Sequence, residues 1–216
     1  MINRPTLKKQ ARKTLSVNFG FYLKLFLFTL IFFFISEGFN VTGTFTAATT
    51  WTQFDSANFF TGLVMFLFQL SAMFGVVDLL RRSTSLDQPF EKAMTIFQSG
   101  DLFIGTIIVE LLCFLWVFLW SLLLVVPGII KAIAYSQAAF IYRDKLNAGE
   151  KIGYSEAVTL SRQMMAGHKW EYFVMQLSFI GWWLLSAITA GLAGIWVLPY
   201  YYITMANYYV QLSQQK

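Results

Sequence analysis

The chain has 216 residues, of which 57% are hydrophobic, 19% are aromatic and only 12% are charged. Soluble domains carry about 25% charged residues, and a soluble fold of this size could not bury so much apolar surface without exposing large patches. Intrinsic disorder is excluded as well, because disordered chains are polar and poor in aromatic residues. The lone Cys113 excludes a disulfide framework and a cysteine metal cluster within one chain. The composition therefore predicts an integral membrane protein.

Six apolar runs predict an all-α, polytopic membrane protein built as a six-helix transmembrane bundle, with residues 1–216 forming a single transmembrane domain. A bilayer core about 30 Å thick requires about 20 helical residues to cross it. The predicted spans are 19–36, 58–80, 102–126, 129–142, 172–192 and 195–212. The first run has a basic front, but no small-x-small cleavage pattern follows it, so we expect a retained span and not a signal peptide. The third run is expected to stop at a turn formed by Pro127 and Gly128, and the fourth run is short.

The distribution of basic residues predicts the orientation of these spans. With the N-terminus in the cytoplasm, 14 of the 16 Lys and Arg residues fall in the inside segments, which are 1–18, 81–101, 143–171 and 213–216. The outside segments contain none of them. Because basic residues resist translocation across the membrane, this distribution predicts six spans with both termini in the cytoplasm.

Two cytoplasmic segments are predicted to form helices that lie on the membrane. Pro89 suits the first turn of a helix, and the apolar spacing after it is typical of one helical face. That face comprises Phe90, Ala93, Met94 and Phe97. The second helix is predicted to have Ser155 as its N-cap. Its shared face comprises Ala157, Val158, Ser161, Met164 and Met165.

Three residues at and after the second helix, Arg162, His168 and Lys169, are candidates for contact with lipid headgroups. Each cation near an anionic surface contributes roughly 1 kcal/mol to the attraction. The pattern is also compatible with interfacial packing that only closes the bundle. We expect the packing role to dominate.

Ionisable residues inside a span are costly, so each is a candidate functional residue. Lys24 is close enough to the inner surface to extend its ammonium group to it, and Asp78 precedes Arg81 and Arg82 at the spacing of a local helical ion pair. Lys131 follows the turn near the outer surface, where it could pair with Glu37 or contact phosphate headgroups.

Glu110 is the most informative of these residues because it lies about eight residues past Leu102, or ~12 Å along a helix, and so approaches the middle of the membrane. A buried carboxylate there must be protonated or paired. A bridge to Lys24, at a similar depth, is the expected structural explanation. A proton or cation relay in a transporter is the functional alternative.

Signals for catalysis are weak. His168 is the only histidine, and no hydrolase, zinc-protease or nucleotide-binding motif is present. We therefore expect no catalytic residue, cofactor or metal site, and no enzyme activity. The Thr-rich segment 37–57 is expected to lie against the headgroups outside; a ligand-binding cap is the alternative.

Several stretches in the C-terminal half carry a family resemblance. They are residues 127–137, 161–165, 167–173 and 177–182, and they include the sequence Gly167-His168-Lys169-Trp170 that leads into Leu177-Ser178-Phe179-Ile180-Gly181-Trp182. Together they resemble an uncharacterised family of integral membrane proteins of Gram-positive bacteria, domain of unknown function 975. The resemblance covers roughly residues 1–212, and its specific motifs all lie after residue 126. It implies a multi-span protein of the bacterial plasma membrane, and it transfers no catalytic or binding residue.

The leading functional hypothesis is a non-enzymatic accessory, scaffold or lipid-interacting protein of the plasma membrane. A small transporter or channel that uses Glu110 is the alternative, and a membrane-embedded lipid-modifying enzyme is a second one. The expected partners are the lipid bilayer and a membrane protein, with no role for nucleic acid. The sequence leaves the oligomeric state open.

Overall fold

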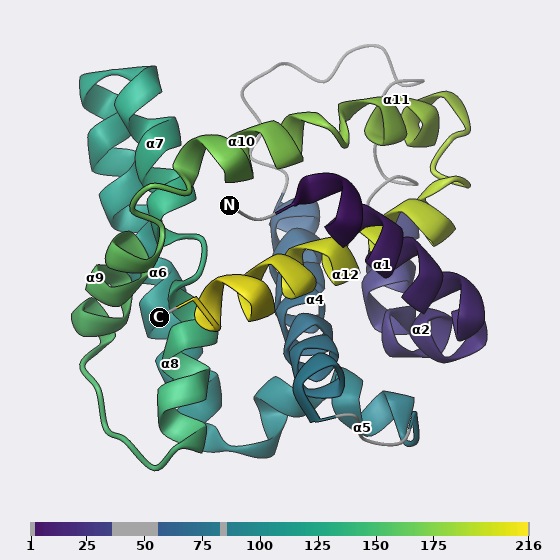
Figure 1. The fold of residues 1–216 in the computed structure, drawn as a ribbon, viewed down its shortest axis with the longest axis horizontal. Coiled ribbons are helices and arrows are strands. Elements are labelled where there is room, and N and C mark those ends of the chain that lie inside the picture. The colour runs from purple at the N-terminus through teal and green to yellow at the C-terminus, as the bar shows by residue number, and fades with distance from the viewer. Residues whose placement is uncertain (1–2, 36–55, 83–85, 216) are drawn as a thin grey trace. The chain divides into compact units, whose positions relative to one another are not determined.

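A computed structural model describes residues 3–35, 56–82 and 86–215, with the side chains of 56–58 and 82 left aside (Figure 1). Every regular element in these ranges is a helix. Four helical segments are long and apolar enough to cross a membrane. They are Phe59–Arg81, Gly100–Leu123, Val125–Asn147 and Lys169–Ile188. The Thr-rich loop 37–57 and Glu37 lie outside the described residues, apart from the backbone at the start of the helix that follows the loop.

These four segments overlap the predicted spans 58–80, 102–126, 129–142 and 172–192. The first predicted span is interrupted, because α2 (Phe19–Leu25) ends at Phe26 and a second helical stretch covers 27–35. The last predicted span coincides with α12 (Gly194–Ser213), which contains Pro199 and five tyrosines. Tyrosine is amphipathic, so α12 is long enough to cross a membrane but less apolar than the other four segments.

The chain divides into two compact units, one of Met1–Arg4, Ile96–Ser178 and Tyr208–Lys216, and the other of Pro5–Thr95 and Phe179–Asn207. The second unit contains a helix that the sequence analysis did not predict, α1 (Arg4–Val17). Its buried residues are Leu7, Ala11 and Leu15, which recur every four residues along one side of the helix. Aromatic side chains stack on one another in this unit. The ring centroids of Phe28 and Phe68 are 4.9 Å apart, and those of Phe26 and Tyr202 are 5.7 Å apart.

The same unit contains α4 (Ser56–Arg82), α5 (Pro89–Ala93) and α11 (Ile180–Ile188). The helix predicted from Pro89 does begin there, with the proline in its first turn. It ends after five residues, however, and a 3-10 helix, η1 (Thr95–Gln98), follows it. The predicted continuous helix to Phe97 is therefore wrong. Ala93 is buried, and Phe90, Met94 and Phe97 are exposed.

The first unit is built on α6 (Gly100–Leu123), α7 (Val125–Tyr135), α8 (Ala138–Asn147), α9 (Tyr154–Met164) and α10 (Lys169–Leu177). Helix α6 packs against α7, α8 and α9. The core between them includes Val109, Cys113, Ala134, Tyr135, Ala138, Tyr142, Ala157 and Val158. At Gly105 a Cβ atom would lie 2.0 Å from the hydroxyl oxygen of Tyr142, so only glycine allows this contact between α6 and α8.

The turn between α6 and α7 lies earlier than the predicted Pro127-Gly128 turn. Leu124 is extended (φ −160°, ψ 144°), and α7 begins at Val125. Pro127 falls in the first turn of α7, where a missing N–H is tolerated because the first four N–H groups of a helix have no acceptor within it. Gly128 donates its N–H to Leu124 O (3.3 Å). A Cβ on Gly128 would lie 2.1 Å from Ser121 Oγ, so this glycine allows the tight hairpin.

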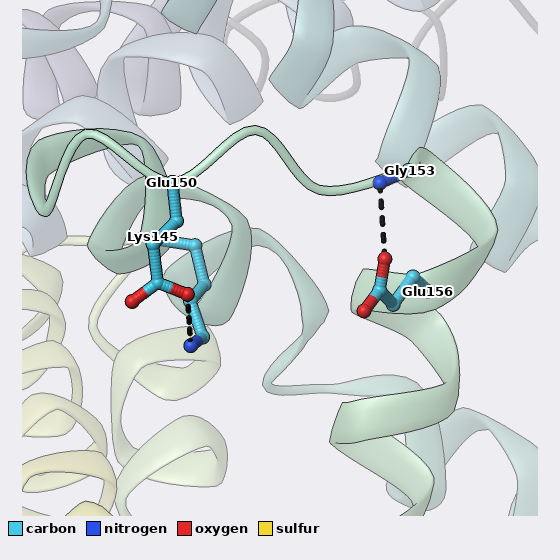
Figure 2. A network of polar contacts seen from close by, with 4 residues as sticks. All are labelled: Lys145, Glu150, Gly153 and Glu156. Carbon is cyan, nitrogen blue, oxygen red and sulfur yellow. Dashed lines mark hydrogen bonds and ion pairs between the residues drawn. The ribbon is translucent and has the colours of Figure 1, made fainter.

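Helix α9 confirms the predicted face but not the predicted N-cap. Ala157, Val158, Ser161 and Met165 are buried and Met164 is partly buried, so the face packs in the protein against α6, α7 and α8. The N-cap is Gly153 and not Ser155, because α9 already begins at Tyr154. The Glu156 carboxylate accepts the Gly153 N–H at 3.3 Å (Figure 2). Before it, Lys145 of α8 and Glu150 of the following connection form a salt bridge of 2.5 Å (Figure 2).

The predicted fifth span contains a turn at Ser178 and Phe179, between α10 and α11. The helical part starts at Lys169, three residues before the prediction, and ends at Ile188, four residues before it. The early end has a local cause: Ala190 and Gly191 both have positive φ angles (49° and 83°), and Thr189 Oγ1 accepts the N–H of Ala193 (3.0 Å).

Candidate functional site

The segment Val125–Asn147 is interrupted in its middle, at Ser136 and Gln137, where α7 ends and α8 begins. Ser136 tightens the backbone here, because both its N–H (3.4 Å) and its hydroxyl (2.9 Å) donate to Ile133 O. Side chains of this kind compete with helical hydrogen bonds. An interruption inside an apolar segment requires substitute partners for the released backbone groups.

Ser161 of α9 supplies those partners. Its hydroxyl donates to Ala134 O at 2.9 Å and accepts the N–H of Gln137 at 3.2 Å. Ser161 is fully buried. A single hydroxyl 24 residues away from Gln137 thus satisfies one carbonyl and one N–H at the break.

Other neutral polar side chains surround the same break. Gln137 Nε2 donates to Ser136 Oγ at 2.8 Å. The hydroxyl of Tyr172, a buried residue of α10, interacts with the side chains of Ser136, Gln137 and Gln176. Ser136, Gln137, Ser161, Tyr172 and Gln176 are called the break cluster below. Its groups are all neutral, which suits the support of a discontinuous helix better than acid-base chemistry.

A second group of contacts surrounds the start of α10. His168 Nδ1 lies 3.3 Å from Glu171 Oε2, and the Tyr208 hydroxyl donates to His168 O at 3.4 Å. Of the predicted headgroup-contact residues, Arg162 is exposed, while His168 and Lys169 are partly buried. The His168–Glu171 contact was not among the sequence-based predictions, although its i, i+3 spacing is visible in the sequence.

Arg143 and Asp144 begin the predicted inside segment 143–171, and charged side chains at a protein surface are usually exposed. Arg143 is instead 1% exposed, and its Nη1 lies 4.0 Å from Asp144 Oδ1. Asp144 also accepts the hydroxyl of Tyr209 at 2.5 Å, and the Tyr209 ring stacks on Phe140 at 4.8 Å. These contacts join α8 to the end of α12, a pairing that no sequence pattern indicated.

The ionisable residues predicted inside the spans are not members of the break cluster. Lys131 Nζ lies 4.4 Å from the centroid of the Trp120 ring and 5.9 Å from that of Tyr135, a cation–π arrangement across the α6–α7 hairpin. Glu110 is partly buried on α6, one turn before Cys113. Lys24 is exposed on α2 and belongs to the other compact unit, so the Lys24–Glu110 bridge remains a prediction. The pairing of Asp78, which is partly buried on α4, with Arg81 or Arg82 also remains a prediction.

Within the part of the chain that the structure describes, no group of three His, Cys, Asp or Glu side chains is placed to hold a metal ion. Comparison with known proteins gives one family. Residues 122–216 match DUF975, a protein family of unknown function. No curated protein and no solved structure matches the chain.

The DUF975 match confirms the resemblance over residues 122–216, and the motifs after residue 126 that carried it lie inside this range; its predicted extension toward residue 1 stays a prediction. All five residues of the break cluster, together with His168, Arg143 and Asp144, also lie inside it. Glu110, Lys24 and Asp78 lie before the DUF975 match.

Proposed function

We propose that this chain is a multi-span protein of the bacterial plasma membrane with an accessory role, as a scaffold or a lipid-interacting protein, and without a reaction of its own. The observation that supports the membrane location is the apolar outer surface of α6 and of the turn into α7. Phe114, Leu123 and Val125 are each about 70% exposed. Further exposed apolar residues there are Leu111, Leu115, Trp116, Phe118, Leu119, Leu122, Leu124, Val126, Ile129 and Ile130. A contiguous patch of this kind requires an apolar environment such as lipid.

Six crossings complete the proposal. Four crossings are the segments that are long and apolar enough to cross a membrane. The other two are α2 together with the helical stretch 27–35, and α12. Both termini are then cytoplasmic, in agreement with the distribution of basic residues. In this arrangement α5 and the connection before α9 are cytoplasmic, and the end of α9 reaches the break between α7 and α8 through Ser161.

A transporter or channel is the second candidate, and Glu110 is the observation that favours it. Its carboxyl group lies on α6 near the middle of an apolar segment of 24 residues, where an ionisable residue is expensive and is commonly functional. The break cluster adds to this candidate, because discontinuous helices form the ion and substrate sites of many transporters.

A flux measurement on Glu110→Gln separates the two candidates. The full chain is reconstituted in liposomes that contain a pH-sensitive dye, and proton flux is followed after a pH jump and again with K⁺ or Na⁺ gradients. The accessory role predicts that wild type and Glu110→Gln both match empty liposomes. Flux in wild type that Glu110→Gln abolishes, and that the control Glu150→Gln on the exposed connection retains, would contradict the accessory role and establish the transporter.

A further inference from the structure

Helix α1 has two sides of opposite character. Leu7, Ala11 and Leu15 are fully buried along one side. Lys9 and Lys13 project from the opposite side, where a helix of 3.6 residues per turn places them one turn apart, and Arg12 flanks them. All three cations are exposed. The apolar side is thus occupied by the protein itself, and the basic side (Lys9, Arg12 and Lys13) is available to a ligand.

No acidic residue nearby in the sequence compensates the positive charge of this basic side. Residues 1–36 contain no aspartate or glutamate. Cations three and four residues apart on a helix repel one another, so an anionic ligand bound to all three would relieve that repulsion. Lys8 differs from them: its ammonium lies 4.2 Å from the centroid of the Phe179 ring, and burial lowers its pKa. Lys8 therefore takes part in packing and is not counted in the basic side.

The position of α1 in the chain indicates which anion it meets. Only Asn18 separates α1 from α2, and its carbonyl accepts the N–H groups of Phe21 and Tyr22. The apolar run of the first proposed span therefore starts directly after the basic side. Clusters of Lys and Arg on an amphipathic helix beside a membrane span are attracted to the anionic lipids of the cytoplasmic leaflet. Guanidinium and ammonium groups also suit the oxygens of a phosphodiester.

We propose that Lys9, Arg12 and Lys13 form a binding surface for the phosphate headgroups of anionic lipids in the cytoplasmic leaflet. This inference rests on the membrane location proposed above. It specifies which class of lipid the protein binds and which residues bind it. Lipid binding at α1 does not depend on Arg162 of α9. In this arrangement α1 lies along the membrane surface with its apolar side against its own protein and its basic side toward lipid phosphates.

The test follows lipid binding at α1 itself. The full chain carries Cys113→Ala, which removes the buried native thiol, and Ser16→Cys with an environment-sensitive dye one turn after Lys13. Dioctanoyl phosphatidylglycerol, dioctanoyl phosphatidylcholine and free glycerol phosphate are titrated into the detergent-solubilised protein. We expect phosphatidylglycerol to bind more tightly than the other two. Lys9→Gln with Lys13→Gln should raise its apparent Kd about 30-fold, because each lysine contributes about 1 kcal/mol, or roughly a factor of five.

Lys9→Arg with Lys13→Arg is the matched control and should bind phosphatidylglycerol within about twofold of wild type, because the charge is kept. Adding 0.5 M NaCl to the wild type should weaken binding without any mutation, since the three cations are exposed. The proposal is overturned if Lys9→Gln with Lys13→Gln binds like wild type, or if phosphatidylcholine or free glycerol phosphate binds as tightly as phosphatidylglycerol. Glu110-dependent flux would overturn the accessory role and leave this titration unchanged, so the two can fail separately.

Discussion

Replacing Ser161 by alanine is expected to lower the free energy of unfolding by about 2–3 kcal/mol. The substitution removes two hydrogen bonds, one to Ala134 O and one from Gln137 N–H. It also leaves a buried N–H at the helix break without its hydroxyl acceptor, and an orphaned buried donor costs roughly 1–3 kcal/mol. Thermal or denaturant unfolding of the purified protein in detergent, followed by circular dichroism, measures the change.

Ser155→Ala is the matched control for this prediction. Ser155 lies on the same helix, α9, but is exposed. The same chemical change there should alter the free energy of unfolding by less than about 0.5 kcal/mol. If Ser161→Ala and Ser155→Ala proved equally mild, Ser161 would not be the residue that supports the break between α7 and α8.

Replacing Gly105 by alanine is expected to destabilise the protein by about 1–3 kcal/mol through overpacking. The new methyl group would lie 2.0 Å from the Tyr142 hydroxyl oxygen and 2.3 Å from the ring carbon that bears it. The Tyr142 ring cannot move without disturbing a core that includes Val109, Cys113 and Ala157, and its hydroxyl donates to Asp101 O (3.4 Å). The same unfolding measurement records the effect.

Gly62→Ala and Gly181→Ala should act in the opposite direction. Both glycines lie within helices, α4 and α11, and a Cβ added to either meets nothing within 4 Å. Alanine in a helix is more favourable than glycine by up to about 1 kcal/mol.

A Gly105→Ala protein as stable as wild type would contradict the prediction for Gly105. It would show that α6 and α8 do not approach as closely as the contact between Gly105 and Tyr142 requires.

The sequence predicted the apolar helices well, because their signal is composition summed over about 20 residues. It also predicted the buried face of α9, since the positions of Ala157, Val158 and Ser161 follow the helical period. Helix α1 could have been found in the same way: Leu7, Ala11 and Leu15 recur every four residues. The lysines and arginines between these apolar residues were interpreted only as a sign that the N-terminus is cytoplasmic.

The interruptions within helices could not be predicted from local sequence. The break at Ser136 and Gln137 depends on Ser161, which lies on another helix and satisfies the released backbone groups. Pro127 and Gly128 predict a turn because these residues usually end helices, but the first turn of a helix tolerates proline. With the turn at Leu124, Lys131 and Trp120 lie on facing helices, so their cation–π contact follows from the hairpin geometry.

The central claim, a six-span membrane protein with both ends in the cytoplasm, is tested most directly by cysteine labelling in intact cells. In a Cys113→Ala background, single cysteines are placed at Thr46 in the predicted outer loop, at Ser155 on α9 and at Ser16 on α1, and are exposed to a membrane-impermeant maleimide. Only the cysteine at position 46 should react in intact cells, and all three should react after the cells are opened. Labelling at position 16 or 155 in intact cells, or protection at position 46 until the cells are opened, would contradict the topology.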